Sequence, residues 1–259
     1  MLMRQTVLIT GASGGLGREL AILFAKDGYN LVLVARSDNR LYALKDKLES
    51  ECGVKVSVFP KDLSEKYAAA DVFDYTQSNN IKVDVLVNNA GFGDFSSFAD
   101  ADIKKLHNLI EVNITALMEL THFYLKPMIE SGGGKIMNLA STAAFQPGSM
   151  MSVYYASKVF VLHFSEGLSV ELKNAGVSVT AFCPGPTKTG FSANAELGGS
   201  GLLKNLNWAS CESAARYGYK KLMQGKVVAI HGLRNKIMAA ATKIVPRALT
   251  RNIVYRIQR

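Results

Sequence analysis

The feature that most constrains this 259-residue chain is a regular alternation of short apolar runs with longer segments of helical periodicity. The runs are rich in Val, Ile and Leu, as expected of strands buried on both faces of a parallel sheet. They occupy residues 6–10, 31–34, 54–59, 83–87, 135–139, 177–182 and 227–230. Strands that alternate with helices are joined by right-handed crossovers, which place helices on both faces of the sheet. The pattern therefore predicts an α/β, doubly wound fold with a seven-stranded parallel sheet.

The composition indicates one globular domain. With 48% hydrophobic and 20% charged residues, the chain can form one large core, and no repeat or Pro-rich linker interrupts it. We therefore expect residues 1–259 to form a single domain. The first apolar run starts almost at Met1, and no apolar stretch reaches about 18 residues, so we expect neither a signal peptide nor a transmembrane helix.

Cysteine and histidine usage indicates a reducing compartment and no metal site. The three cysteines, Cys52, Cys183 and Cys211, form no CxxC pair, and the four histidines are dispersed along the chain. An odd number of separated cysteines disfavours both a disulfide framework and a zinc site. We therefore expect a cytoplasmic protein without a bound metal.

The net charge of +9 is concentrated in the C-terminal fifth of the chain, because all 21 acidic residues lie at or before Glu212. The basic residues beyond that point are Arg216, Lys220, Lys221, Lys226, Arg234, Lys236, Lys243, Arg247, Arg251, Arg256 and Arg259. In the extension 232–259, apolar residues at helical spacing lie among these cations, which predicts two short basic amphipathic helices. Three roles compete: docking on the body or on a dimer partner, peripheral contact with anionic lipid, and nucleic-acid binding, of which we expect the last not to apply.

A glycine-rich loop follows the first predicted strand and leads directly into a helical pattern. The loop reads Thr10-Gly-Ala-Ser-Gly-Gly-Leu-Gly17. Its glycines allow a tight turn that brings a helix N-terminus against a pyrophosphate, whose charge meets unpaired N–H groups and the positive end of the helix dipole. The alternative is a plain strand-to-helix turn. The flanking strand and helix favour the first interpretation, which predicts cofactor contacts from Gly11, Ser13, Gly15, Leu16 and Gly17.

The ends of the second and third strands indicate which dinucleotide is bound. An acid at the end of the second strand would accept hydrogen bonds from the adenosine ribose, but Ala35 cannot, whereas the guanidinium of Arg36 can pair with a 2′-phosphate. NADP(H) is therefore predicted over NAD(H), unless Arg36 is only a solvated cation. Beyond the third strand, Asp62 and Leu63 are placed beside the adenine, and Asp62 can also cap a helix that begins near Ser64.

Small and amide residues follow the fourth strand in the segment Asn88-Asn-Ala-Gly91. Small side chains allow a cofactor to approach the backbone closely, and the amides can tie neighbouring strands together. We therefore predict further cofactor contacts from Asn89, Ala90 and Gly91.

A hydroxyl, a phenol and an ammonium group follow the fifth strand. Ser141 comes first, and Tyr154 and Lys158 lie four residues apart at the start of a predicted helix, so they share one face. A nearby cation favours phenolate, which would lower the pKa of Tyr154 from about 10 toward the range useful for proton transfer. Taken alone, the pair is better explained as two surface residues of a helix. The adjacent Tyr155 does not have the required spacing from Lys158.

Together these motifs resemble the classical short-chain dehydrogenase/reductase family. The resemblance covers roughly residues 5–190 and is carried by the glycine loop, Asn88-Asn-Ala-Gly91, Asn113, Ser141, Tyr154-Tyr-Ala-Ser-Lys158 and Pro184-Gly-Pro-Thr187, in order and at family spacing. The loop also fits the TGxxGxxG spacing of the extended branch, which includes epimerases and dehydratases. The chain length, the motif ending at Gly91 and the spacing from Ser141 to Tyr154 favour the classical branch.

The resemblance implies a Rossmann domain that reduces a carbonyl to an alcohol, or the reverse, by hydride transfer with NADP(H). In such a site Tyr154 is the general acid/base, Lys158 lowers its pKa and holds the nicotinamide ribose, and Ser141 hydrogen-bonds the substrate oxygen. Asn113 positions a water that links Lys158 to solvent. The residues along the nicotinamide are Pro184, Gly185 and Thr187.

The resemblance also implies a lid and subunit contacts. Residues 187–208 correspond to the substrate lid, and their apolar content indicates a partly hydrophobic substrate, although the same residues can simply pack the lid onto the body. A homodimer or homotetramer is expected from the family. The alternative function is a non-catalytic, dinucleotide-sensing protein on the same fold, which the intact set of Asn113, Ser141, Tyr154 and Lys158 disfavours.

Overall fold

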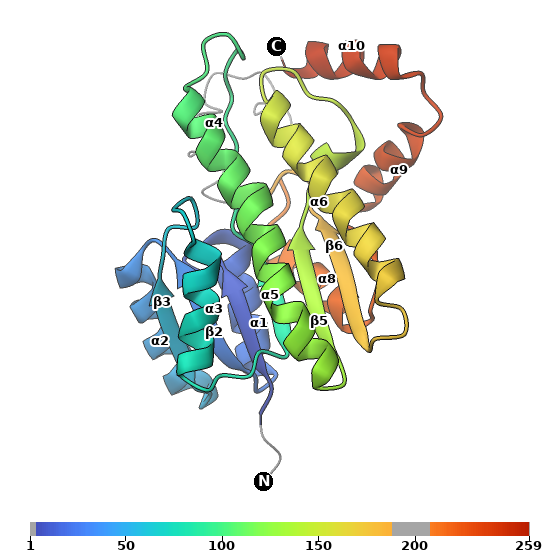
Figure 1. The fold of residues 1–259 in the computed structure, drawn as a ribbon. Coiled ribbons are helices and arrows are strands. Elements are labelled where there is room, and N and C mark those ends of the chain that lie inside the picture. The colour runs from blue at the N-terminus through green and yellow to red at the C-terminus, as the bar shows by residue number, and fades with distance from the viewer. Residues whose placement is uncertain (1–3, 188–207, 259) are drawn as a thin grey trace.

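The computed structural model describes residues 4–187 and 208–258, within which seven strands form one parallel sheet in the order β3-β2-β1-β4-β5-β6-β7 (Figure 1). The strands are β1 (Thr6–Thr10), β2 (Asn30–Ala35), β3 (Val56–Pro60), β4 (Val85–Asn88), β5 (Gly134–Leu139), β6 (Val177–Cys183) and β7 (Val228–Ile230). Each strand overlaps the run predicted for it, so the doubly wound Rossmann fold is confirmed. The strand order reverses between β1 and β4, which is where such sheets open a crevice for a ligand.

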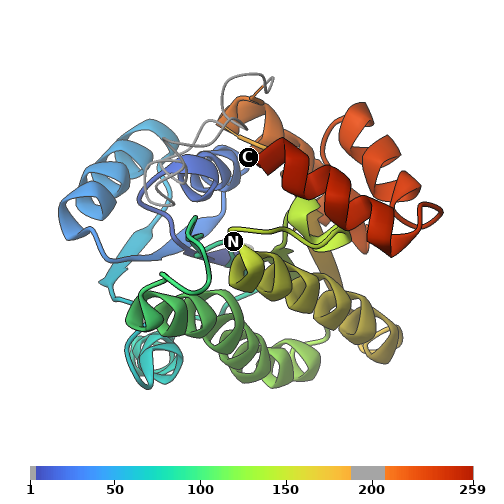
Figure 2. The ribbon, with the colours of Figure 1, turned by 90° about the horizontal axis from the view of Figure 1, so that it is seen from above.

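Helices cover both faces of the sheet. They are α1 (Gly15–Lys26), α2 (Asp38–Cys52), α3 (Ala68–Ser78), α4 (Ile103–Ile110), α5 (Ala116–Glu130), α6 (Ser152–Glu171), α8 (Cys211–Met223), α9 (Leu233–Ala241) and α10 (Arg247–Gln258), with a π-helical turn η1 (Glu111–Thr115) between α4 and α5 and a short 3-10 helix η2 (Thr142–Phe145). Seen from above, α1, α2 and α8 lie on one face, and α3, α5 and α6 lie on the other (Figure 2). The core accordingly has two halves, with Phe24 fully buried in one and Tyr124 in the other.

Helix α2 illustrates how the sequence determines these elements. Leu41, Leu44 and Leu48 are three or four residues apart, and all three side chains are buried against the sheet. The helix ends at Gly53, whose φ of +62° is left-handed. The backbone N–H of Gly53 donates to the carbonyl oxygen of Glu49 at 3.0 Å, which satisfies one of the last carbonyl groups of the helix.

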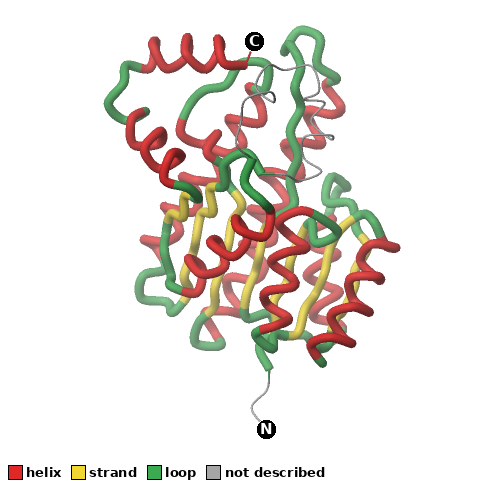
Figure 3. The backbone as a smooth tube through the Cα atoms, turned by 180° about the vertical axis from the view of Figure 1, so that it is seen from behind, coloured by secondary structure: helices red, strands yellow, loops and turns green. Residues whose placement is uncertain are grey.

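The residues after β7 form the two helices predicted there, α9 and α10. These helices lie beyond the carboxyl ends of the strands, at the end of the molecule opposite the N-terminus (Figures 1 and 3). The predicted lid, residues 187–208, lies outside the described residues except at its ends, where Thr187 forms an isolated β-bridge with Ala209. In the described ranges no helix is long and apolar enough to cross a bilayer.

Candidate active site

A cavity of about 750 Å³ lies at the carboxyl ends of the central strands, between the loops that follow them, α6 and the C-terminal helices. The predicted site residues that line it are Gly11, Ser13, Gly15, Leu16, Asn89, Ala90, Gly91, Ser141, Tyr154, Lys158, Pro184, Gly185 and Thr187. Ligands of open parallel sheets bind at this edge, close to the switch point of the strand order. The fold thus brings most of the predicted cofactor and catalytic residues to one place.

The remaining predicted site residues do not line this cavity; they are Gly17, Arg36, Asp62, Leu63 and Asn113. The side chain of Leu63 is buried in the core beneath α3 and α5, so only its backbone is available to a ligand. Arg36 and Asp62 lie beside each other, with 3.6 Å between Nη1 and Oδ2, and the Arg36 side chain is 71% exposed. The guanidinium is therefore accessible to an anion approaching from solvent.

The second role predicted for Asp62, capping a helix that begins near Ser64, is wrong, because no helix begins there. Its Oδ1 accepts hydrogen bonds from the backbone N–H of Ser64 at 3.0 Å and from the Ser64 hydroxyl at 2.9 Å. These contacts close a tight turn, and α3 begins only at Ala68. The carboxylate thus stabilises the loop that follows β3.

The glycine loop has two positions where a side chain would not fit, one in its turn and one where α1 approaches it closely. Gly11 has a φ of +66°, and a Cβ there would lie 2.7 Å from Nδ2 of Asn89. A Cβ on Gly17, in the first turns of α1, would collide with the carbonyl oxygen of Gly11. The first turn of α1 carries no acidic side chain that would oppose an anion. The loop and the helix N-terminus therefore form a cradle with the size and polarity for a pyrophosphate.

Thr10 holds the loop after β4 against the glycine loop, a role that the sequence reasoning missed. Its Oγ1 accepts hydrogen bonds from the backbone N–H groups of Asn89 and Ala90, both at 3.0 Å. In return, Nδ2 of Asn89 donates to the carbonyl oxygens of Thr10 at 2.8 Å and of Gly11 at 3.2 Å. The only sequence signal for this role was the position of Thr10 at the start of the glycine motif.

A buried amide network joins β4 to β5, as the amides after the fourth strand predicted. Nδ2 of Asn88 donates to Oδ1 of Asn138 at 2.9 Å and to the hydroxyl of Thr121 at 3.0 Å. Asn138 in turn donates to the hydroxyl of Ser165 on α6 at 3.0 Å. The strand ends beside the cavity are therefore fixed to the helices that pack on them.

Arg40 is a second basic residue at this site that the sequence reasoning did not single out. It lies in the first turn of α2, four residues after Arg36, and it lines the cavity. The sequence signal that could have identified Arg40 is its spacing of four residues from Arg36 after the second strand. The pair gives this corner of the site a positive charge suited to a phosphate.

Helix α6 presents Tyr154 and Lys158 to the cavity from its first two turns. Both side chains are buried, with exposed fractions of 9% and 4%. Nζ of Lys158 lies 5.8 Å from the centroid of the Tyr154 ring and donates to the carbonyl oxygen of Leu139 at 2.8 Å. Ser141 caps η2, where its Oγ accepts from the backbone N–H of Ala143 at 3.1 Å.

Burial controls the protonation of this pair. Loss of hydration raises the pKa of Tyr154 to about 12, against the lowering effect of a hydrogen bond with Ser141. The same cause lowers the pKa of Lys158 to about 8. The lowered Tyr154 pKa expected from the neighbouring ammonium is therefore not found, because desolvation outweighs the hydrogen bond with Ser141 and the neighbouring Tyr155 raises the pKa further. Near neutral pH the Tyr154 side chain is a phenol, which can donate a proton.

Asn113 is fully buried in η1, and its amide joins two parts of the site. Its Oδ1 accepts from the backbone N–H of Phe92 at 3.1 Å, and its Nδ2 donates to the Phe92 carbonyl and to Oγ of Ser157, both at 3.0 Å. A Cβ on Gly91 would lie 2.9 Å from Oδ1 of Asn113 and 3.3 Å from Nζ of Lys158. Only glycine leaves room between these two groups. The π-helical geometry around Asn113 was not predicted, although such turns are frequent at functional sites.

The segment after β6 is fixed between η2 and α9. The carbonyl oxygen of Pro184 accepts from the backbone N–H of Thr142 at 3.0 Å, and the Thr187 hydroxyl donates to the Gly185 carbonyl at 2.8 Å. A Cβ on Gly185 would collide with the side-chain amide of Asn235. The predicted nicotinamide segment therefore lies against the C-terminal helices.

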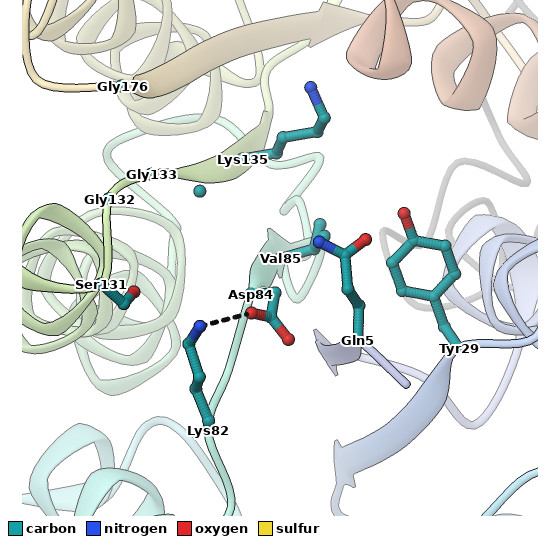
Figure 4. A pocket seen from close by; sticks show the side chains of 11 residues that line it. Gln5, Tyr29, Lys82, Asp84, Val85, Ser131, Gly132, Gly133, Lys135 and Gly176 are labelled. Atoms are coloured by element: carbon teal, nitrogen blue, oxygen red, sulfur yellow. Dashed lines mark ion pairs between the residues drawn. The ribbon is translucent and has the colours of Figure 1, made fainter. Parts of the chain in front are cut away.

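A smaller cavity of about 320 Å³ lies at the opposite, amino-terminal edge of the sheet (Figure 4). There Nζ of Lys82 pairs with Oδ1 of Asp84 at 3.2 Å, while Oδ2 of Asp84 accepts from the backbone N–H of Thr6 at 2.8 Å. These charged groups hold the start of β1 in place. The described residues contain no group of three or more His, Cys, Asp or Glu side chains that could hold a metal ion.

The chain is similar to known oxidoreductases over most of its length. Residues 5–198 match the family model of the short chain dehydrogenases. The chain is 38% identical over 192 residues to sulfoacetaldehyde reductase 2 of Chromohalobacter salexigens. The aligned residues cover 73% of this chain and 75% of that protein.

Solved structures of other proteins share the fold. A short-chain dehydrogenase from Sphingobium yanoikuyae in complex with NADPH has a TM-score of 0.84 and 32% identity, over 92% of this chain and 94% of that one. The bulky-bulky ketone specific alcohol dehydrogenase from Comamonas testosteroni has a TM-score of 0.78 and 28% identity, over 94% and 96% of the two chains. Because the family match includes the glycine loop, Ser141, Tyr154 and Lys158, the chain belongs to the short-chain dehydrogenase/reductase family, whose members use NAD(P)H, and is an oxidoreductase acting on alcohol or carbonyl groups.

Proposed function

We propose that this chain is an NADP(H)-dependent carbonyl reductase, or alcohol dehydrogenase in the reverse direction, for partly hydrophobic small molecules. One observation carries the proposal: the Tyr154 phenol and the Lys158 ammonium are buried together in a cavity that also contains an anion cradle. Reduction of a carbonyl with a nicotinamide requires a proton donor and a dinucleotide site in one place.

The residues around the cavity fit a dinucleotide. The glycine loop from Gly11 to Gly17 would hold the pyrophosphate, because a side chain on either glycine would collide with the protein atoms that shape the loop. Asn89, Ala90 and Gly91 would lie beside the cofactor, and Pro184, Gly185 and Thr187 would lie along the nicotinamide. When bound, the nicotinamide supplies or accepts the hydride.

The catalytic side chains would then donate the proton and replace it from solvent. In the direction of reduction, Tyr154 donates its proton to the substrate oxygen, which the Ser141 hydroxyl holds in place. The Lys158 ammonium, whose pKa is about 8, stabilises the phenolate that remains. Asn113 fixes α6 through Ser157 and positions the water through which the proton is replaced from solvent.

The preference for NADP(H) is supported by the charges around the adenosine end of the site. Ala35, at the end of β2, has no carboxylate to bind a ribose hydroxyl, while Arg36 and Arg40 supply two accessible cations for a 2′-phosphate. Asp62 and the backbone of Leu63 would lie beside the adenine. The similar protein from Sphingobium yanoikuyae is in complex with NADPH.

The walls of the cavity support a partly hydrophobic substrate without a strong negative charge. Phe145, Met151, Met238, Val245 and Ile253 line it, and Arg40 and Lys158 are its only Lys or Arg side chains in the described ranges. Both cations have roles in the proposed cofactor and proton-transfer chemistry. A larger ketone therefore suits the described walls better than a small anionic aldehyde.

We further propose a cytoplasmic homodimer or homotetramer. Ile103 and Ile110 of α4 and Met118 of α5 are 58%, 39% and 40% exposed, which supports packing of these helices between subunits. The three cysteines, all within the described residues, form no disulfide, as suits a reducing cytoplasm. Light scattering of the full chain measures the assembly directly.

Turnover of NADPH with ketones and aldehydes of graded size tests the proposal. Tyr154→Phe should lower kcat by at least about 100-fold while NADPH still binds, and Tyr155→Phe should lower it far less. Equal losses in the two variants would refute the assignment of Tyr154. Binding of NADPH without turnover of any carbonyl would instead indicate a dinucleotide-sensing protein.

A further inference from the structure

The two C-terminal helices have a face that lines the cavity and another that faces solvent. On α9 and the turn after it, Met238, Thr242 and Val245 recur at intervals of three or four residues and line the cavity. On α10 the cavity is lined by Thr250, Ile253 and Val254. The inner faces therefore belong to the site already described, and the outer faces need a separate explanation.

The outer face of α9 and the turn after it carry a stripe of exposed apolar side chains. Leu233 and Ile237 lie one helical turn apart on one side of α9, and Ile244 follows in the turn after the helix. Their exposed fractions are 73%, 60% and 86%, large values for side chains of this kind. Leu249 of α10 adds a fourth exposed apolar residue at 52%.

Basic side chains surround this stripe, and that of Lys236 also lies over the Tyr217 ring, with 5.6 Å between Nζ and the ring centroid. Arg234, Lys236 and Lys243 flank it on α9 and the following turn, and all three are exposed. Helix α10 adds Arg247, Arg251 and Arg256, also exposed. No acidic residue follows Glu212 in the sequence, and no ion pair within residues 4–187 and 208–258 involves any of these six cations. The positive charge of this surface is therefore not neutralised by the protein.

We propose that the outer surface of α9 and α10, defined by these apolar and basic residues, docks on an anionic lipid bilayer. Exposed Leu and Ile side chains can enter the acyl boundary, while the surrounding Arg and Lys side chains meet lipid phosphates. A second copy of this chain fits less well, because a two-fold contact would place the same cations against each other. Nucleic acid would leave the apolar stripe without a partner.

The position of this surface in the fold is consistent with such docking. Helices α9 and α10 form one end of the molecule, beyond the carboxyl ends of the strands, and the amino ends of the strands point the other way (Figures 1 and 3). A protein bound through the outer faces would hold its cavity just beneath the bilayer surface, with the inner faces of the same helices as its wall. The docking itself does not depend on the reaction catalysed.

Binding of the full-length protein to sedimenting vesicles tests the proposal without any measurement of activity. We expect the protein to pellet with phosphatidylcholine vesicles that contain about a third phosphatidylglycerol, not with pure phosphatidylcholine, and to be released by high salt. Equal pelleting with both vesicle types, or none with the anionic ones, would overturn it.

Two double variants separate the apolar and electrostatic contributions. Ile237→Gln with Ile244→Gln, and Arg234→Gln with Lys243→Gln, should each weaken binding to anionic vesicles by about tenfold. Their matched controls are Val170→Gln, which is 73% exposed on α6, and Lys55→Gln with Lys173→Gln, two exposed lysines elsewhere; both should bind as the unaltered protein does. Because the replaced side chains are exposed, thermal unfolding should change little in any variant.

The experiment gives different results for a lipid bilayer and for a second copy of this chain as the partner of this surface. If Ile237→Gln with Ile244→Gln lowers the molar mass in light scattering without lipid, the outer surface is a subunit interface and the proposal is wrong. Unchanged vesicle binding in both double variants would also reject it. A loss in both doubles, with the controls and the molar mass unaltered, supports lipid docking.

Discussion

The side-chain amide of Asn113 donates a hydrogen bond to Oγ of Ser157 at 3.0 Å, and both side chains are fully buried. Ser157 lies on α6 between Tyr154 and Lys158, and its hydroxyl donates to the Tyr154 carbonyl at 2.7 Å. The π-helical turn after α4 is thereby joined to the turn of α6 that carries the proton donor. A change at Asn113 should therefore affect both stability and catalysis.

Asn113→Ala removes this link and leaves the backbone N–H and C=O of Phe92 without their partner. We expect a loss of about 2–4 kcal/mol in the free energy of unfolding, together with a lower kcat, since buried polar groups without hydrogen bonds are costly. Urea denaturation and steady-state turnover measure the two effects. The control is Asn79→Ala, where an exposed amide donates to the Tyr75 carbonyl at 2.8 Å and the loss should stay below about 1 kcal/mol. Similar losses in both variants would contradict a special role for Asn113.

Gly91→Ala should impair catalysis while leaving the fold intact. The added methyl group would press on Oδ1 of Asn113 and Nζ of Lys158, at 2.9 and 3.3 Å, and displace the ammonium from its position. We expect kcat to fall by about tenfold or more, because small displacements of catalytic groups are costly. Gly167→Ala on the same helix as Lys158 meets nothing within 4 Å, so it should leave kcat unchanged and stabilise α6 by about 0.5–1 kcal/mol. An unaltered kcat in Gly91→Ala would show that the site has more room than the structure indicates.

Lys158 should make the stability of the protein depend on pH between about 8 and 10.5. Burial lowers its pKa to about 8 from the usual 10.5 of lysine, so in this window the unfolded chain binds a proton that the folded chain does not. The free energy of unfolding contributed by Lys158 therefore rises with pH across the window, and the buried ammonium is most destabilising below it.

Replacement by Lys158→Met measures this effect. Relative to the variant, the unaltered protein should be least stable below pH 8 and should gain stability as the pH rises toward 10.5. Urea denaturation series at several pH values provide the comparison, and the variant should also lose most of its turnover. Two stability curves that run parallel through this window would argue against the lowered pKa.

Arg36→Ala and Arg40→Ala should each weaken NADPH binding by about tenfold and leave NADH binding nearly unchanged. The reason is that only the 2′-phosphate distinguishes the two cofactors, and each guanidinium offers it a charge-assisted hydrogen bond. Calorimetric titration with both cofactors makes the comparison. Arg216→Ala is the matched control, since that side chain is 69% exposed, close to the 71% of Arg36, and pairs with Glu212 as Arg36 pairs with Asp62. Preference for NADH in the unaltered protein would overturn the cofactor assignment.

The sheet and much of the site were predictable because their signals are local. Each buried strand is a continuous apolar run, and the residues after these runs meet at one edge because parallel strands all end there. Tyr154 and Lys158 share a face of α6 because four residues make about one helical turn. The cradle formed by Gly11 and Gly17 could be predicted from the strand before the glycine loop and the helix after it.

The features that could not be predicted depend on packing between distant segments. Nothing in the sequence around Tyr154 shows that burial would raise its pKa, because burial depends on elements from the whole chain. The contact between Thr10 and Asn89 joins loops that are separated by three crossovers. The turn at Asp62 misled because a carboxylate that closes a turn and one that caps a helix have the same local pattern.

The C-terminal helices line the cavity without packing in the layers of the sheet. The residues proposed for the chemistry and these residues of the substrate wall therefore lie in different parts of the chain. The pyrophosphate cradle and the proton donor are formed by segments before residue 190, whereas α9 and α10 contribute only the wall against which a substrate would rest. Exchanging the residues after Gly232 with those of a relative should therefore transfer substrate range while preserving the cofactor and the stereochemical face of hydride delivery. Substitutions in this tail can therefore reshape the cavity wall without replacing a residue of the cradle or the proton donor.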